Sequence, residues 1–250
     1  TAPGRHYVED CRRILGDIDE AEASAGGSYA TPSGVLTVTA PVLFGQYHLM
    51  PVMTEFLAQH PAVVGRVLFF DRMVNLVEEG IDVAVRIGQL PDSSYSAIKV
   101  GSVRRVVCGA PSYFERHGVP RTPADLAAHT LIANTNSSAP VDWRFGPEAK
   151  SAIAFHPRLF CNTNEASISA AMSGWGLTRT LSYQIDKPVA DGRLRTILEE
   201  FEPEPLPIHV VHTEGRYVSA KTRAFVDFAV DRLRAAGITS ASTVSGKGRA

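Results

Sequence analysis

Histidine, cysteine and carboxylate side chains are the groups of this sequence that could ligate a metal ion or act as a base or nucleophile. Of the eight histidines, the two closest in sequence are His209 and His212, whose side chains would leave a strand on opposite faces. The three cysteines are scattered, as is typical of free thiols in a reducing compartment: Cys11, Cys108 and Cys161. A carboxylate run among prolines is typical of a solvated connection: Glu199, Glu200, Glu202 and Glu204. We therefore expect no metal site and no catalytic residue.

Nucleotide-binding and hydrolase motifs are also missing from the sequence. It contains neither a phosphate-binding loop ending in Gly-Lys-Ser/Thr nor a Gly-x-Ser-x-Gly elbow. Gly174-Trp-Gly176 matches half of a dinucleotide fingerprint, but it follows a predicted helix instead of joining a strand to a helix. We expect no cofactor.

The length and charge of the chain limit its class. With 250 residues it can form one large domain or two lobes, and its net charge of −1 gives no general attraction for DNA phosphates. Contact with DNA would have to come from another segment. The sequence has no apolar run long enough for a membrane span and no basic region followed by an apolar core at its start.

Alternating strand and helix patterns begin after residue 34. Strands are predicted at residues 35–39, 65–70 and 81–87, with helices between them that end at Pro61 and Gly80. This order predicts βαβ units and a parallel sheet covered on both faces. Because ligands of such sheets collect at the carboxyl ends of the strands, the predicted ligand-binding loops are 39–45, 71–73 and 86–90.

A second α/β unit is predicted from Arg104. Its strands are expected at 104–109, 130–134, 143–145, 151–155, 158–161, 176–180 and 194–198. Helices are expected at 112–117, from Thr122, and at 165–173 with Asn164 as the N-cap. Prolines at 203, 205 and 207 indicate a second segment that crosses between the units. The strand at 208–212 and the helix at 218–236 that follow it are expected to belong to the first unit.

The segment from Arg5 to Ala25 is predicted to be a helix of its own. Its apolar and small residues recur at intervals of four and three, which is the spacing of a coiled coil: Tyr7, Cys11, Ile14, Ile18, Ala21 and Ala25. Pairing with a second copy is the favoured interpretation, and packing back onto its own domain is the alternative. Residues 26–34 are predicted to be a linker.

Several strings in this order closely resemble LysR-type transcriptional regulators, over about residues 5–236. They are Gly34-Val-Leu-Thr-Val-Thr-Ala-Pro-Val-Leu-Phe-Gly45, Leu76-Val-Glu-Glu-Gly-Ile-Asp-Val-Ala-Val-Arg-Ile-Gly88, Asp92-Ser-Ser94, Ala110-Pro-Ser-Tyr-Phe114, Asp125-Leu-Ala-Ala-His129, Gly174-Trp-Gly176, Asp191-Gly-Arg-Leu194 and Ser219-Ala-Lys-Thr-Arg-Ala-Phe-Val-Asp227. The resemblance implies an α/β fold of two Rossmann-like lobes of periplasmic-binding-protein type II design, joined by two crossover segments and preceded by a linker helix.

The resemblance also implies a division of the chain and a role for each part. Residues 1–33 would be the linker and dimerisation helix, 34–103 with 208–237 lobe I, 104–207 lobe II, and 238–250 a disordered tail. A small-molecule effector would bind between the lobes in a cytoplasmic homodimer or homotetramer. DNA would be bound only through a winged helix-turn-helix that this chain does not contain, and no membrane would be contacted.

The effector-binding residues implied by the resemblance each have a structural alternative. They are Thr39, Ala40, Pro41, Phe70, Asp71, Arg86, Ile87, Trp143, Thr163 and Asn164, with Asn134–Asn136 as weaker candidates. Thr39 could only end its strand, Arg86 could pair with a carboxylate, Asn164 could only cap a helix, and Trp143 could be core. A guanidinium and a helix N-terminus favour an anionic effector.

Two other functions remain open from the sequence. The first is a periplasmic solute-binding receptor of a transport system, which would share the two lobes but need no dimerising helix. The second is a small transferase or lyase on the same architecture, although no nucleophile and base pair is visible.

Overall fold

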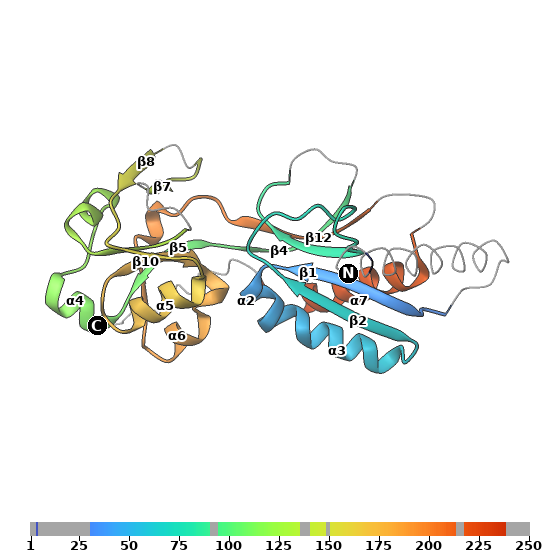
Figure 1. Ribbon diagram of the computed structural model, residues 1–250. Helices are drawn as coiled ribbons and strands as arrows, with labels where there is room; N and C mark the ends of the chain where they lie inside the picture. The colour runs from blue at the N-terminus through green and yellow to red at the C-terminus, as the bar shows by residue number, and fades with distance from the viewer. Residues whose placement is uncertain are drawn as a thin grey trace, which may run out of the picture. The chain divides into compact units, whose positions relative to one another are not determined.

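The computed structural model describes Gly4 and residues 31–90, 95–135, 141–148, 151–213 and 218–238. The described residues form two compact units (Figure 1). Unit 1 contains residues up to 101 together with 208–237, and unit 2 contains residues 102–207 together with Ile238. The predicted linker helix at 5–25 and the predicted tail beyond Ile238 lie outside the described residues.

Unit 1 is built on a mixed five-stranded sheet. Its order is β2 (Val63–Phe69), β1 (Gly34–Ala40), β3 (Val83–Ile87), β12 (Leu206–Thr213) and β4 (Tyr95–Val103). Strand β1 is parallel to both β2 and β3, whereas β12 is antiparallel to β3. The predicted parallel arrangement is confirmed for β1, β2 and β3, and β12 reverses the direction.

Two helices pack against each other and against this sheet. The first runs continuously through α2 (Val42–Phe44), the π-helical segment η1 (Gly45–Leu49) and α3 (Met50–Gln59). The second is α7 (Ala220–Ala235), which starts where the Ser219 side chain accepts a hydrogen bond from Thr222 N–H. Phe56 and Phe225 are fully buried and meet edge to face with ring centroids 5.1 Å apart. Such aromatic pairs fix the angle between helices while burying large apolar surfaces.

The helix predicted at residues 72–79 is wrong. The segment forms turns instead, and it leaves Met73 and Val77 exposed while it buries Val74 and Leu76. The Asn75 side-chain oxygen accepts a hydrogen bond from Val77 N–H at 3.2 Å, so a local turn replaces the helical ladder. Its buried residues Val74 and Leu76 pack on the face of the sheet that carries Ala84 and its partner Val211. The segment therefore covers this face without forming a helix.

Unit 2 contains a second five-stranded sheet. Its order is β11 (Arg195–Ile197), β5 (Arg105–Gly109), β10 (Leu177–Leu181), β6 (Leu131–Asn134) and β9 (Leu159–Cys161). Strands β10, β6 and β9 are parallel, and β5 is antiparallel to both of its neighbours. Around it are α4 (Pro111–His117), η2 (Pro123–Ala128), α5 (Asn164–Met172), η3 (Ser182–Gln184), α6 (Asp186–Ala190), η4 (Glu199–Phe201) and the hairpin β7 (Val141–Phe145) and β8 (Ser151–Phe155).

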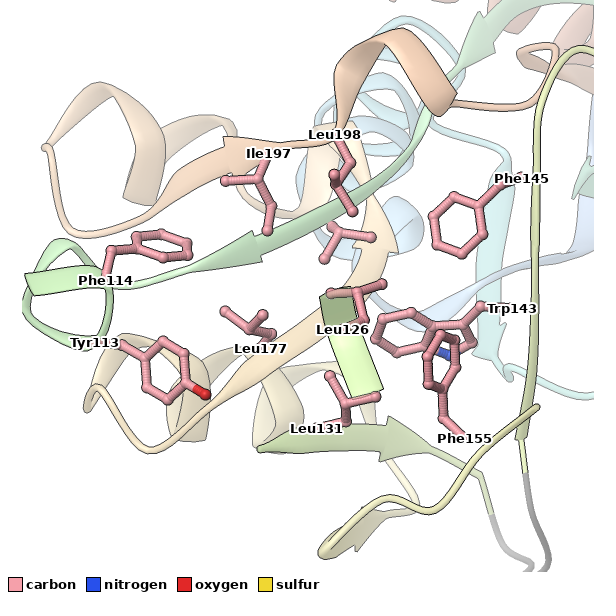
Figure 2. Close-up of a cluster of buried hydrophobic side chains, with 11 residues drawn as sticks. Tyr113, Phe114, Leu126, Leu131, Trp143, Phe145, Phe155, Leu177, Ile197 and Leu198 are labelled. Carbon is pink, nitrogen blue, oxygen red and sulfur yellow. The ribbon is translucent and has the colours of Figure 1, made fainter. Parts of the chain in front are cut away.

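The core of unit 2 is an aromatic and aliphatic cluster between this sheet and the β7–β8 hairpin (Figure 2). Trp143 is 5% exposed and meets Phe155 edge to face at 5.4 Å. Figure 2 shows Trp143 and Phe155 beside Leu126 and Leu131, and Phe145 belongs to the same cluster. The hairpin is therefore held by burial of its aromatic side chains.

Strand β4, helix α6 and the short 3-10 helices η3 and η4 were not predicted from the sequence. Strand β4 lies where no element was predicted, and its two buried residues, Val100 and Val103, are three positions apart, so no strand-like alternation marks it. Helix α6 has no buried residue, so no apolar spacing marks it.

A buried tyrosine and two histidines form a polar cluster at the edge of the unit 2 core. The Tyr113 hydroxyl accepts a hydrogen bond from Thr130 N–H at 2.9 Å and lies 3.2 Å from His129 Nδ1. A hydroxyl proton donated to Nδ1 requires the neutral imidazole, which agrees with the lowered pKa of His129. Burial lowers the pKa of His129, and nearby His117, stacked on Tyr113 at 4.6 Å, lowers it further.

Acidification should therefore weaken unit 2 through His129. Its folded pKa lies below its unfolded value, so this stabilisation is complete above about pH 6.5 and is lost as the pH falls below that value. We expect the free energy of unfolding to fall less on acidification in His129→Asn than in the unsubstituted protein, because the asparagine oxygen can still accept from Tyr113. Urea unfolding at neutral and mildly acidic pH measures this.

The exposed His156 provides the matched control for this experiment. His156→Asn should keep the pH dependence of the unsubstituted protein. Burial also lowers the pKa values of His48 and His209, which contribute equally to all three proteins. The assignment fails if His129→Asn and His156→Asn behave alike.

Candidate functional site

The carboxyl ends of three parallel strands bring the predicted effector-binding residues of unit 1 together. We call these the strand-end group: Thr39, Ala40, Pro41, Phe70, Asp71, Arg86 and Ile87. Strands β1, β2 and β3 end at Ala40, Phe69 and Ile87, and their parallel pairing places these ends at one edge of the sheet. Thr39 is 2% exposed, and its hydroxyl donates to Leu68 O at 2.5 Å. This bond ties β1 to β2 directly before the edge.

Asp71 connects the loop after β2 to the start of the helix after β1. Its Oδ1 accepts a hydrogen bond from Val42 N–H at 3.0 Å, and Phe70 N–H donates to Ala40 O at the same distance. Asp71 thus caps the helix from a distant part of the sequence, where a carboxylate also complements the helix dipole. In the same helix, position 45 needs a glycine, because a Cβ there would lie 2.5 Å from the Phe69 ring.

Arg86 holds the 71–80 segment in place. Its Nη2 donates to Val74 O at 2.7 Å, and burial lowers the pKa of its guanidinium, opposed by Tyr95 and Glu79. The alternative that Arg86 pairs with a carboxylate does not match this arrangement, since both Glu79 oxygens are bonded to Arg72 at 2.9 and 2.8 Å. Arg72 also lies over the Phe70 ring, 4.6 Å from its centroid.

The predicted effector-binding residues of unit 2 lie at the N-terminus of α5. Thr163 is the N-cap, and its hydroxyl accepts from Ala166 N–H at 3.3 Å. The expectation that Asn164 caps this helix is wrong, because Asn164 is the first helical residue. Its Oδ1 instead accepts from Asn134 Nδ2 at 2.6 Å, which joins α5 to the end of β6. Thr163, Asn164 and Asn134 are called the α5-start group below.

Trp143 is not brought to either group. It lies in the aromatic core of unit 2, so its expected effector contact is replaced by a core position. Two contacts beside the strand-end group were not predicted: the Val74 carbonyl that accepts from Arg86, and the bidentate pair between Arg72 and Glu79. No sequence signal marks a backbone acceptor, and the wrong helix prediction gave the wrong faces for this segment.

The titratable groups give no sign of metal or nucleophilic chemistry in the described part of the chain. No three His, Cys, Asp or Glu side chains there are placed to hold a metal ion. Burial raises the pKa of the Cys108 thiol to about 12, which keeps it protonated. Nor does any helix within the described ranges have both the length and the apolar character needed to cross a bilayer.

These features define the class of α/β ligand-binding domains made of two sheet units, with polar residues at the carboxyl ends of parallel strands. The LysR substrate binding domain family matches residues 30–234. The chain therefore belongs to the LysR-type transcriptional regulators, and these residues are its effector-binding domain, with the two-unit type II periplasmic-binding-protein fold.

Relatives and solved structures agree with this assignment. An HTH-type transcriptional regulator of Xanthomonas campestris is 33% identical and covers 93% of this chain and 69% of its own length. An uncharacterized HTH-type regulator of Haemophilus influenzae is 31% identical over 88% of this chain and 77% of its own. The structure of CrgA, a LysR-type regulator from Neisseria meningitidis, is similar with a TM-score of 0.72 at 26% identity, covering 93% and 80% of the two chains. A transport receptor is accordingly not favoured.

The corrected cap of α5 leads to a stability prediction. Thr163→Ala should lower the free energy of unfolding by about 1 kcal/mol, because Ala166 N–H loses its acceptor. Thr163→Ser keeps the hydroxyl and should keep most of that stability. Chemical denaturation measures both variants, and equal losses would show that the hydroxyl does not cap the helix.

Proposed function

We propose that this domain binds a small anionic effector without changing it chemically, through the strand-end group of unit 1 and the α5-start group of unit 2. The observation that carries this proposal is the strand-end group itself. Four of its residues end β1 and β3, the other three directly follow β1 and β2, and the Asp71 to Val42 bond joins the segments after β1 and β2. Loops held in this way present preorganised polar groups to a ligand.

Two features favour an anion. Arg86 uses Nη2 to hold Val74 O, which leaves other N–H groups of the planar guanidinium for a carboxylate or phosphate. The start of α5, a nine-residue helix, has backbone N–H groups and the positive end of the helix dipole. Thus both proposed contacts, the Arg86 guanidinium in unit 1 and the start of α5 in unit 2, favour a negatively charged ligand.

The proposed role is sensing and not catalysis. The matched relatives are transcriptional regulators, and the proposed groups contain no nucleophile beside a base. Binding would favour one conformation of the domain, and the intact regulator would pass that change to its DNA-binding segment. Because the DNA is its target, we place the protein in the bacterial cytoplasm.

A thermal-shift screen of small carboxylates, aromatic acids and sugar phosphates tests the effector proposal. A ligand at one hundred times its Kd should add about 2.7 kcal/mol to the free energy of unfolding. We expect the shift caused by a positive compound to be lost in Arg86→Ala and in Asn164→Ala. The ligand-induced shift is compared instead of the melting temperature, since Arg86→Ala also removes the bond to Val74 O.

Arg232→Ala serves as the matched control for arginine removal. Arg232 lies on α7 and pairs with Glu55, outside both proposed groups. This variant should keep the full ligand-induced shift. A positive compound whose shift survives both Arg86→Ala and Asn164→Ala would rule out the assigned contacts.

We also propose that residues 1–33 dimerise the protein, on the basis of the spacing from Tyr7 to Ala25. Light scattering on the 250-residue chain should give the mass of a dimer or tetramer. Ile14→Asp, which places a charge in the apolar stripe, should lower that mass, whereas Arg13→Gln on the polar side should not. A monomeric mass for the unsubstituted chain contradicts this proposal.

A further inference from the structure

Two arginines lie together on one face of the unit 2 sheet, separate from both effector groups. In the antiparallel pairing of β5 with β10, Arg105 stands opposite Leu181, and Val107 stands opposite Arg179. Arg105 and Arg179 are therefore diagonal neighbours on the same face, a separation of about 7–8 Å that long side chains span. Val107 belongs to the aromatic core cluster, so this face is the one covered by the β7–β8 hairpin.

Arg179 is half-buried and only partly satisfied. Its Nη2 donates to Arg144 O on β7, and its guanidinium lies 5.0 Å from the Phe145 centroid and 6.0 Å from that of Trp143. Its Nε is buried and has no hydrogen-bond partner among the described residues. A buried N–H of a charged group is costly to leave unpaired. Burial and, to a smaller extent, the positive charge of Arg105 lower the pKa of Arg179 to about 10, although Glu202 opposes them.

Arg105 offers a second guanidinium beside the first. Part of its side chain is exposed, and burial of the rest lowers its pKa. Within the described ranges it makes no ion pair or side-chain hydrogen bond. Solvent can therefore reach the pair from the Arg105 side.

The carboxylate of Glu202, which attracts Arg179, is already engaged. Both Glu202 oxygens accept from Arg104 Nη1, at 3.0 and 3.1 Å, in a pair whose side chains are 18% and 11% exposed. Glu202 attracts Arg179 electrostatically but forms no hydrogen bond with it in the described structure. The guanidiniums of Arg105 and Arg179 are thus two partly desolvated positive charges, and some of their N–H groups have no acceptor in the described structure.

We propose that Arg105 and Arg179 form a binding site for a phosphate group, beside Phe145 and distinct from the effector site. A tetrahedral oxyanion that approaches from the Arg105 side has enough acceptors to receive N–H groups of both guanidiniums together. The site would connect β5, β10 and, through Arg144 O, the hairpin. It shares no residue with the strand-end or α5-start groups, so it can exist whether or not the effector proposal holds.

The test is direct binding of inorganic phosphate to the 250-residue protein. The ³¹P resonance of phosphate should broaden when protein is added at constant ionic strength, and calorimetry should give a Kd. Arg105→Gln should weaken binding at least about tenfold, because a charge-assisted bond is lost. Arg179→Lys keeps the charge but removes Nε–H and the fork, so it should also weaken binding.

Arg195→Gln is the matched control. Arg195 lies on the neighbouring strand β11 with its guanidinium 4.8 Å from the Phe114 centroid, but Gly109 stands opposite it in the sheet. This variant should bind phosphate as the unsubstituted protein does. The proposal is overturned if the unsubstituted protein does not broaden the resonance, or if Arg105→Gln and Arg195→Gln have equal affinity.

Phenyl phosphate distinguishes the two sources of the phosphate group. Tighter binding than inorganic phosphate, lost in Arg105→Gln, identifies the phosphoryl group of a larger molecule packed on Phe145. Equal affinity identifies the free ion. Asn164→Ala and Arg86→Ala should leave both affinities unchanged, which separates this site from the effector site.

Discussion

The hydrogen bond from Val42 N–H to Asp71 is the contact on which the candidate site of unit 1 depends. It joins the helix that follows β1 to the loop that follows β2, and Phe70 N–H to Ala40 O reinforces it. Parallel pairing of β1 with β2 and β3 brings the strand ends to one edge, but it does not fix the loops beyond them. The capping carboxylate does, because it satisfies a helix N–H that has no partner within the helix.

In both units, charged side chains near the proposed sites are held by backbone groups. Arg86 donates to Val74 O, and Arg179 donates to Arg144 O. Carboxylates nearby are paired elsewhere, Glu79 with Arg72 and Glu202 with Arg104. A guanidinium held by a carbonyl keeps its full positive charge, so it still attracts an anion, whereas one paired with a carboxylate would attract it much less.

Much of the fold followed from apolar periodicity, and the errors have local physical causes. The strands around residues 35–39, 131–134 and 208–212 and the helix near 220–235 bury regular apolar faces, which a sequence displays. In the 72–79 segment, Met73 and Val77 are spaced as on one face of a helix. The Asn75 side chain instead accepts a hydrogen bond from Val77 N–H, which favours a turn. Thr163 and Asn164 are both good caps, so spacing could not choose between them. Asp71 and Arg86 form hydrogen bonds with backbone atoms of Val42 and Val74, which are distant in the sequence. No residue pattern predicts such bonds.

The turns at 71–80 have a consequence for how such a domain diversifies. A crossover helix must keep its length and its apolar stripe, because both are matched to the sheet beneath it. Here only Val74, Leu76 and Ile81 are anchored in the cluster, while Met73 and Val77 are exposed. Substitutions or insertions at the exposed positions leave the sheet's own packing intact. The exposed residues of the segment that Arg86 holds can thus change during evolution while the sheet keeps its structure.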